Sequence, residues 1–323
     1  MAVRSIAEYG DELTNVEQVL QALHQCREQN LTFTPVGQGS NIIASTHVAG
    51  FVGVIAIQGV ELLGESQASV DVRVGAGEVW HPFVQRCLAQ GWYGLENLSL
   101  IPGTVGAAPI QNIGAYGVEV SSFITAVEVL DREGVRQLFS ADQCQFAYRT
   151  SLFRNNVDYV VTHVHMRLSR LPQVNTTYPG VAQMLEQMGC EMPTPENLAQ
   201  AIVRIRQAKL PDPNEHPNSG SVFKNPVVSR AEAAKLAEQI DNLQQFELAD
   251  DAGNVKLSAA QLIDSLGWKE KGTAQIACWH LQPLVIVNNG TEKGEDVLAF
   301  AQSIQRDVQT SLGVQLELEP IVL

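Results

Sequence analysis

The sequence predicts a mixed α/β (α+β) fold divided into more than one domain. Its 323 residues are long for one ordinary domain, so two or three domains are expected. Segments with helical periodicity are interspersed with segments in which apolar residues recur at every second position. A hydrophobic fraction of 45% and a charged fraction of 17% are typical of a folded globular enzyme rather than of a disordered chain.

Charge and cysteine content narrow the class of protein. The net charge of −14 argues against binding to nucleic acid or to an anionic membrane, since both need basic surface. No apolar run approaches the roughly 20 residues of a transmembrane helix, and no signal peptide is visible. The five cysteines are far apart and lack a Cys-x-x-Cys pair, which excludes a disulfide framework and a zinc site. We therefore expect a cytoplasmic protein without a bound metal.

The first elements surround a short glycine-containing loop. Residues 14–29 predict an amphipathic helix with Thr14 and Glu17 as its capping box. Strands are expected over residues 33–36 and 51–57. Between them Gly37-Gln-Gly-Ser-Asn41 resembles a phosphate loop after a strand, but the third glycine of a Rossmann fingerprint is missing. A plain turn is at least as good an interpretation of this loop.

Further strands and helices are predicted along the rest of the chain. The pattern predicts strands over residues 70–74, 124–130, 135–139 and 159–168, and helices over residues 80–90, 195–208 and 258–266. His163 and His165 share one face of a strand, which could suggest a metal site. No third ligand lies near them in the sequence, so we expect two structural histidines. The prolines in Lys209-Leu-Pro-Asp-Pro213 mark a connector between domains.

The stretch from Leu98 to Val120 is rich in glycine and alanine and carries a single charge, Glu119. Glycine lets a backbone approach a ligand closely and tolerates positive φ. Backbone N–H groups turned inward by such turns suit a pyrophosphate, and the amides of Gln111 and Asn112 can bind polar edges of a ring. The stretch therefore predicts a ligand site; a tight, buried loop with no ligand is the alternative.

Several motifs occur in one order along the chain. They are Gly37-x-Gly-Ser-Asn41, Ile101-Pro-Gly through Gly117, Tyr148-Arg149, Lys209-Leu-Pro-Asp-Pro213, Gly220-Ser-Val-Phe-Lys-Asn-Pro226, Val255-Lys-Leu257 and Leu262-Ile-Asp264. From about Asn15 onward the chain thus resembles the UDP-N-acetylenolpyruvoylglucosamine reductase (MurB) family, flavoenzymes of peptidoglycan precursor synthesis. Tyr178 points to the longer, type I subtype.

The resemblance implies an FAD-binding region of two α/β subdomains, of the vanillyl-alcohol-oxidase kind, and a smaller α+β substrate-binding domain. The implied boundaries are 1–66 and 67–208 for the two FAD subdomains, with the C-terminal strand 312–323 added to the second, and 209–311 for the substrate domain. It also implies NADPH as reductant, a UDP-sugar as substrate and a monomer. The residues that match FAD-binding positions are Gly37, Gly39, Ser40, Asn41, Ile42, Pro102, Gly103, Val105, Gly106, Ala107, Gln111, Asn112, Gly114, Ala115, Tyr116 and Gly117.

The implied reaction is a hydride transfer from flavin N5 to C3 of an enolpyruvyl group, followed by protonation at C2. Arg149 matches the arginine that stabilises the substrate carboxylate, Glu319 the assisting glutamate and Ser221 the proton donor. Each has a plainer interpretation: Arg149 as a surface residue and Ser221 as an ordinary turn serine. The residues that match substrate-binding positions are Tyr178, Lys209, Asn225, Lys269 and Gln282.

Four departures from the family pattern bear on these expectations. Met1 falls inside or after the segment with which the family usually starts, so part of the flavin pocket's wall is absent or the start is misassigned. A shift of two residues at the C-terminus would place Ile321 where Glu319 is expected. Phe246 is nearest to an expected tyrosine, and His280 lies beside the family's histidine position. Another flavoenzyme of this fold, such as an alcohol oxidase, or a non-catalytic flavin-binding protein are the alternatives.

Overall fold

Two units make up the computed structural model, which describes residues 1–248, 251–269 and 271–323. The N-terminal unit comprises Ala7–Gly39 and Ala49–Ala208. The C-terminal unit comprises Met1–Ile6, Ser40–Val48 and Lys209–Leu323. The finer division into 1–66, 67–208 and 209–311 stays a prediction.

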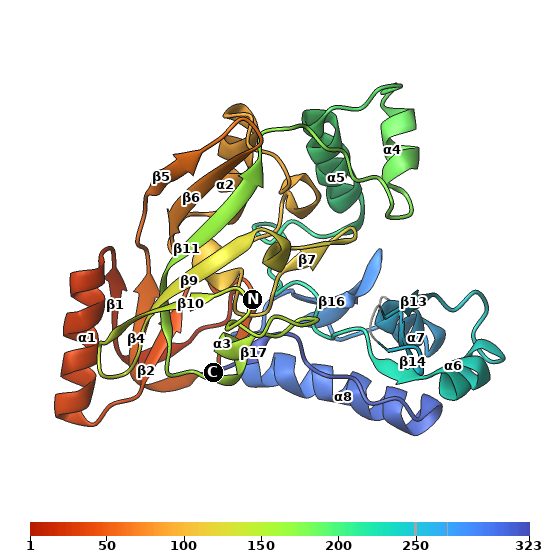
Figure 1. The fold of residues 1–323 in the computed structure, drawn as a ribbon. Coiled ribbons are helices and arrows are strands. Elements are labelled where there is room, and N and C mark those ends of the chain that lie inside the picture. Colours follow the sequence, from red (N-terminus) through yellow and green to blue (C-terminus); the bar gives the residue numbers. More distant parts are fainter. Residues whose placement is uncertain (249–250, 270) are drawn as a thin grey trace. The chain divides into compact units, whose positions relative to one another are not determined.

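A three-stranded sheet and helix α1 begin the N-terminal unit. The strand order is β1 (Ile6–Leu13), β4 (His47–Ile55) and β2 (Phe33–Val36), and α1 (Val16–Gln29) packs its buried side chains into the same core (Figure 1). The predicted capping box of Thr14 and Glu17 is wrong. The backbone of Asn15 is extended and its side chain accepts the Gln18 N–H at 3.0 Å, while the Gln18 side chain accepts the Thr14 N–H at 2.7 Å.

The largest sheet of this unit has five antiparallel strands. Its order is β10 (Arg136–Ser140), β9 (Ile124–Leu130), β11 (Val160–Ser169), β6 (Ser69–Gly75) and β5 (Val60–Glu65). Strands β6, β9, β10 and β11 confirm the strands predicted from the alternating pattern, whereas β5 was not predicted. Figure 1 shows the sheet as a continuous twisted layer. Val70, Val72 and Val74 point into one core with Trp80 and Phe83 of α2 (Trp80–Ala89).

Shorter elements complete the N-terminal unit. They are the 3₁₀ turns η1 (Glu96–Leu98), η2 (Val105–Ala107) and η3 (Val120–Ser122), the strands β7 (Gly114–Ala115) and β8 (Val118–Glu119), and the helices α3 (Leu152–Asn155), α4 (Val181–Gln187) and α5 (Pro195–Lys209). Helices α4 and α5 pack on each other through Val181, Leu185, Leu198 and Ile202, and Tyr116 packs against this cluster. The α4–α5 pair therefore has a small core of its own beside the glycine-rich stretch.

The C-terminal unit joins segments from three parts of the sequence. Its strands are β12 (Val227–Ser229), β14 (Asn254–Leu257) and β13 (Gln245–Glu247) in one sheet, β15 (Ile276–Trp279) with β16 (Gln282–Asn288), and β17 (Ile321–Val322) parallel to β3 (Ile42–Ile43). Its helices are α6 (Arg230–Ala237), α7 (Ala259–Ser265) and α8 (Gly294–Leu312). Helix α8 contacts β3, β16 and α7, and a Cβ on Gly294 would lie 1.8 Å from the Ala44 carbonyl oxygen. Only glycine permits this contact.

Glu128 organises a half-buried cluster of charges on the five-stranded sheet. Its carboxylate accepts hydrogen bonds from Arg73 Nε and Nη2 at 2.6 and 2.8 Å, and lies 2.7 Å from His165 Nε2 and 3.3 Å from His163 Nδ1. These contacts confirm the structural interpretation of the two histidines. Arg73, followed by the two histidines, holds the pKa of Glu128 well below its ordinary range. Within residues 1–248, 251–269 and 271–323, no group of three or more His, Cys, Asp or Glu side chains is placed to hold a metal.

Glu96 is the opposite case, a carboxyl buried away from cations. It is 2% exposed, and its two oxygens accept the Gly94 N–H at 2.8 and 3.0 Å. Burial, with a smaller contribution from the negative charge of Glu196, raises the pKa of Glu96 to about 7. Glu96 is therefore partly protonated in the folded protein near neutral pH.

Replacing Glu128 by glutamine should lower the free energy of unfolding by about 2 kcal/mol at pH 7, because Arg73 loses its half-buried counter-ion. The folded pKa of Glu128 lies below the ordinary value of 4.5, so its contribution is present above that pH and is lost as the pH falls through the folded value. Urea unfolding should show the gap between wild type and Glu128→Gln narrowing below pH 4.5. Glu133→Gln, in the exposed turn nearby, is the control and should change little at any pH.

Glu96→Gln should remove a pH dependence of stability. Because the folded pKa of Glu96 is raised from 4.5 to about 7, its protonated form stabilises the wild type below pH 4.5, and this contribution falls away as the pH rises through 7. The difference amounts to at most about 3 kcal/mol. Thermal unfolding should show that the free energy of unfolding falls less between pH 5 and pH 8 in Glu96→Gln than in wild type or in the exposed control Glu186→Gln. Equal losses in all three proteins would contradict the buried, protonated state.

Candidate functional site

The glycine-rich stretch lies against the turn between β6 and α2. Gly103 O accepts the Trp80 N–H at 2.9 Å, and the Gly106 N–H donates to Ala76 O at 2.9 Å. A Cβ on Gly106 would lie 2.4 Å from the Cβ of Ala76, and Gly103 has a φ of +114°. Glycine is therefore needed at both positions for the backbone itself.

The first glycine loop meets this stretch inside the N-terminal unit. A Cβ on Gly37 would lie 2.7 Å from Thr104 Oγ1, so the two loops predicted to bind one ligand are neighbours. Gly39 has a φ of +67° with no atom within 4 Å of where its Cβ would be. The loop thus presents bare backbone on an open side, as close approach of a ligand requires.

The first glycine loop ends in the C-terminal unit, whose second segment begins at Ser40. Asn41 Nδ2 donates to Glu319 O at 3.3 Å, Asn41 O accepts the Ile321 N–H at 3.0 Å, and Ile42 is the register partner of Ile321. The end of the predicted phosphate loop therefore pairs, within the C-terminal unit, with the segment that carries Glu319, the predicted assisting glutamate.

The remaining predicted FAD residues differ in accessibility. Among all sixteen, Gly103, Val105, Gly106 and Asn112 are buried, Pro102 and Gly117 are exposed, and Gly37, Gly39, Ser40, Asn41, Ile42, Ala107, Gln111, Gly114, Ala115 and Tyr116 are half-buried. The Asn112 side chain is engaged by the protein, since Nδ2 donates to Glu119 Oε2 and Ala147 O, and Oδ1 accepts the Ser121 N–H. Both amide hydrogens of the Asn112 side chain are therefore used within the protein.

Arg149 lies against the hairpin of β7 and β8. Its Nη2 donates to Gly114 O at 2.6 Å, and its Nη1 is 3.5 Å from Asn112 O. Tyr116 and Gly117 both have positive φ, +50° and +81°, which is the conformation of a tight two-residue hairpin turn. The structure thus places the predicted catalytic cation directly on the predicted cofactor stretch.

Tyr116 connects this hairpin to Tyr178, a predicted substrate-binding residue. The two rings meet edge to face with centroids 5.3 Å apart, and Asn97 Nδ2 donates to Tyr116 O at 3.0 Å. Burial lowers the pKa of the Arg206 guanidinium, and interaction with the Tyr116 side chain opposes this shift. Sequence reasoning missed Arg206, although its spacing of three residues from Lys209 on a helix was a signal.

Ser221 and Glu319 lie on paired segments of the C-terminal unit. Val222 O accepts the Glu319 N–H at 2.9 Å, Lys224 N–H donates to Glu317 O at 3.0 Å, and Phe223 is bridged to Leu318. On its other side the serine segment pairs with β16, where Ser221 faces Val285. Residues far apart in sequence therefore bring a hydroxyl and a carboxylate side chain onto neighbouring strands.

The other predicted substrate residues of this unit differ in role. Asn225 Oδ1 accepts the Ala259 N–H at 3.0 Å and so supports the start of α7, a structural task that sequence reasoning missed. Lys269 is exposed beyond α7. Packing of protein around the ammonium of Lys209 lowers its pKa.

Gln282 and Trp279 lie opposite each other in the β15–β16 pair, and each has a buried polar side-chain atom without a hydrogen-bond partner among the described residues. Within the described part of the chain, the buried atoms Gln282 Oε1 and Trp279 Nε1 have no hydrogen-bond partner. A buried acceptor or donor without a partner is costly unless a ligand or water supplies one. The Trp279 ring contacts the rings of His216 and His280, at centroid distances of 4.8 and 4.3 Å.

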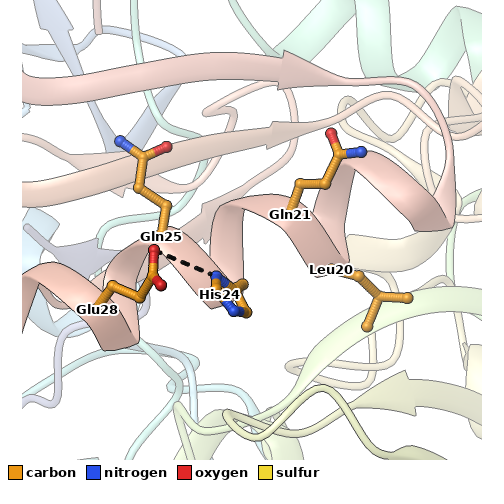
Figure 2. Close-up of a pocket in the computed structure, with 5 residues that line it drawn as sticks. All are labelled: Leu20, Gln21, His24, Gln25 and Glu28. Atoms are coloured by element: carbon orange, nitrogen blue, oxygen red, sulfur yellow. Dashed lines mark ion pairs between the residues drawn. The ribbon is translucent and has the colours of Figure 1, made fainter.

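Arg149 belongs to the N-terminal unit, and Ser221 and Glu319 to the C-terminal unit. Their grouping around one substrate stays a prediction. A surface depression lined by Leu20, Gln21, His24, Gln25 and Glu28 of α1 contains none of the predicted site residues, and Figure 2 shows its ion pair of His24 with Glu28.

Comparison with known families agrees with the motifs. A model described as "FAD binding domain" matches residues 11–138. A second, described as "UDP-N-acetylenolpyruvoylglucosamine reductase, C-terminal domain", matches residues 212–323. The two matches fall on the two segments of the chain that carry the glycine loops and the serine motif.

Similar proteins cover nearly the whole chain. A UDP-N-acetylenolpyruvoylglucosamine reductase of Chromobacterium violaceum is 46% identical over 89% of this chain and 85% of its own length. The corresponding protein of Pseudomonas aeruginosa is 42% identical over 94% of this chain and 89% of its own. The crystal structure of a UDP-N-acetylenolpyruvylglucosamine reductase from Thermus caldophilus shares the fold, with a TM-score of 0.65 and 24% identity over 97% of this chain and 91% of that one.

These matches confirm the resemblance inferred from the motifs and the mixed α/β fold with an FAD-binding region. They are also consistent with an enzyme that depends on a flavin. The chain belongs to the UDP-N-acetylenolpyruvoylglucosamine reductase family.

Proposed function

We propose that this chain reduces UDP-N-acetylglucosamine enolpyruvate to UDP-N-acetylmuramate with NADPH and FAD, a step in peptidoglycan precursor synthesis. The observation that carries the proposal is the pairing of the Ser221 segment with the Glu319 segment through the bond from Glu319 N–H to Val222 O. This bond pairs the main chains that carry Ser221 and Glu319 within one unit, which supports assigning both residues to one reaction.

The glycine loops fit a flavin nucleotide. No atom lies within 4 Å of where a Cβ of Gly39 would be, and a Cβ on Gly117 would meet only Thr177 Oγ1 at 3.8 Å, so both turns leave room for a ligand beside the backbone. We assign Gly37, Gly39, Ser40, Asn41, Ile42, Pro102, Gly103, Val105, Gly106, Ala107, Gln111, Asn112, Gly114, Ala115, Tyr116 and Gly117 to the surroundings of FAD. Of these, the buried Gly103, Val105 and Gly106 would act by shaping the backbone. Bound FAD would supply hydride transfer between NADPH and the enolpyruvyl group.

Arg149 would stabilise charge on the substrate. Hydride addition at C3 builds negative charge at C2, which spreads onto the neighbouring carboxylate. A guanidinium already held by Gly114 O needs little reorganisation to stabilise that charge, and such preorganised electrostatics is usually a large contribution to catalysis. Glu319 would orient the same carboxylate through shared protons.

Ser221 would donate the proton to C2 and regain one from water. An unassisted serine is a poor acid, so the donation depends on position and on hydrogen-bonded surroundings. The substrate's diphosphate and neighbouring groups would be held by Tyr178, Lys209, Asn225, Lys269 and Gln282. The unpartnered Oε1 of Gln282 is an acceptor that a ligand N–H or O–H would satisfy.

The compartment and the assembly state are part of the proposal. All five cysteines are free thiols, as expected in a reducing compartment, and we propose the cytoplasm. No helix in the described residues is long and apolar enough to cross a membrane. The monomeric state stays a prediction.

Purified protein should contain flavin and show two separable half-reactions. NADPH should bleach the flavin absorbance under anaerobic conditions, and the enolpyruvyl sugar nucleotide should then restore it. Stopped-flow absorbance measures both steps. Bleaching without restoration would leave a flavoenzyme of another substrate class, and absence of flavin would contradict the proposal as a whole.

Ser221→Ala should leave bleaching by NADPH at the wild-type rate and slow flavin reoxidation by the substrate by about 10²- to 10⁴-fold, the usual range for losing a general acid. Ser45→Ala, a serine hydroxyl of the same unit that bonds His47 O and Leu323 O, is the control. Equal loss of both half-reactions would instead point to a folding role of Ser221.

A further inference from the structure

We propose that Asn218 is a positioning residue for Ser221, acting through the conformation of Gly220. The proposal rests on the assignment of Ser221 as proton donor. Asn218 is not among the predicted catalytic, cofactor-binding or substrate-binding residues.

The side chain of Asn218 closes the turn that leads into Ser221. Its Oδ1 accepts the Gly220 N–H at 2.9 Å, and its Nδ2 donates to His216 O at 2.8 Å. Asn218 is 8% exposed, so water cannot readily replace either bond. The oxygen and the nitrogen of the Asn218 amide therefore both bond the main chain of the turn, at Gly220 and at His216.

Gly220 needs such a restraint. Its φ is +72°, and no atom lies within 4 Å of the position of a Cβ, so packing does not hold this residue. Glycine also has the widest choice of backbone conformations. The Asn218 side chain supplies a local bond that selects the left-handed conformation, as asparagine does in turns two residues ahead.

The residues on either side of the turn are already anchored. Pro217 O accepts the Asn288 N–H at 2.8 Å, and Val222 N–H donates to Leu284 O at 2.8 Å. Ser221 is bridged to Val285 at the edge of the second anchor, so the backbone angles of residues 218–220 decide how the chain enters Ser221 and how its side chain is directed. Loss of the Asn218 bond would let Ser221 Oγ spread over several positions while the surrounding ladder stays intact.

A displaced proton donor is costly even in a folded protein. A misplacement of about 1 Å can reduce the rate of a catalysed step about 100-fold. The effect should be confined to the half-reaction in which Ser221 acts. Flavin reduction by NADPH does not use the Ser221 hydroxyl and should be unaffected.

The test compares Asn218→Ala with Asn218→Ser in anaerobic stopped-flow. Asn218→Ala should slow flavin reoxidation by the substrate about 10- to 100-fold and leave reduction by NADPH within about twofold of wild type. A serine hydroxyl can accept the N–H two residues ahead, though more weakly, so Asn218→Ser should recover most of the rate. Both variants lose the bond to His216 O, so their difference isolates the Gly220 contact. Asn214→Ala, in the exposed turn of the same segment, is the matched control and should match wild type.

A double variant separates positioning from general destabilisation. If Asn218 acts through Ser221, then Asn218→Ala should add less than about twofold in a Ser221→Ala background. Additive losses, equal slowing of both half-reactions, or no recovery in Asn218→Ser would overturn the inference. A wild-type rate in Asn218→Ala together with a slow Ser221→Ala would overturn it while the proposed function stands. A wild-type rate in Ser221→Ala would instead refute the proton-donor assignment.

Discussion

Much of the N-terminal unit depends on backbones that approach more closely than side chains allow. Gly106 lies on Ala76, Gly37 lies on Thr104, and a Cβ on Gly77 would lie 2.3 Å from the carbonyl carbon of Ala56. Replacing any of these glycines by alanine would add a methyl group at the contact and force the segments apart. The glycines thus allow these segments of the N-terminal unit to lie in direct contact.

The C-terminal unit achieves its geometry by strand pairing instead. The serine segment lies between β16 and the segment of Leu318 and Glu319, and each side supplies backbone hydrogen bonds. Such ladders set the position of a main chain well but leave a glycine turn free to vary. This is why the amide of Asn218 matters next to Gly220, whereas Val222 needs no side-chain support.

The buried polar groups of the described residues differ in how they are satisfied. Glu128 is surrounded by Arg73 and two histidines, and Asn112 makes three hydrogen bonds within the protein, so both stabilise the fold. Gln282 Oε1 and Trp279 Nε1 are buried and have no partner among the described residues. Groups of the second kind carry an energetic cost that a bound ligand can remove.

The helices and strands with strong periodicity, the glycine loops and the family could all be predicted from the sequence. They depend on local conformational preferences and on motif spacing, which are readable along the chain. The folded structure was needed to show that Asn15 rather than Thr14 caps α1, that Asn225 supports α7 and that the Trp279 N–H has no partner among the described residues. Hydrogen-bond partners remote in sequence set these roles, because an asparagine or arginine has the same intrinsic chemistry in a cap, a core or a site. Pairing of the segments around Ser221 and Glu319 likewise follows from long-range contacts that no local pattern encodes.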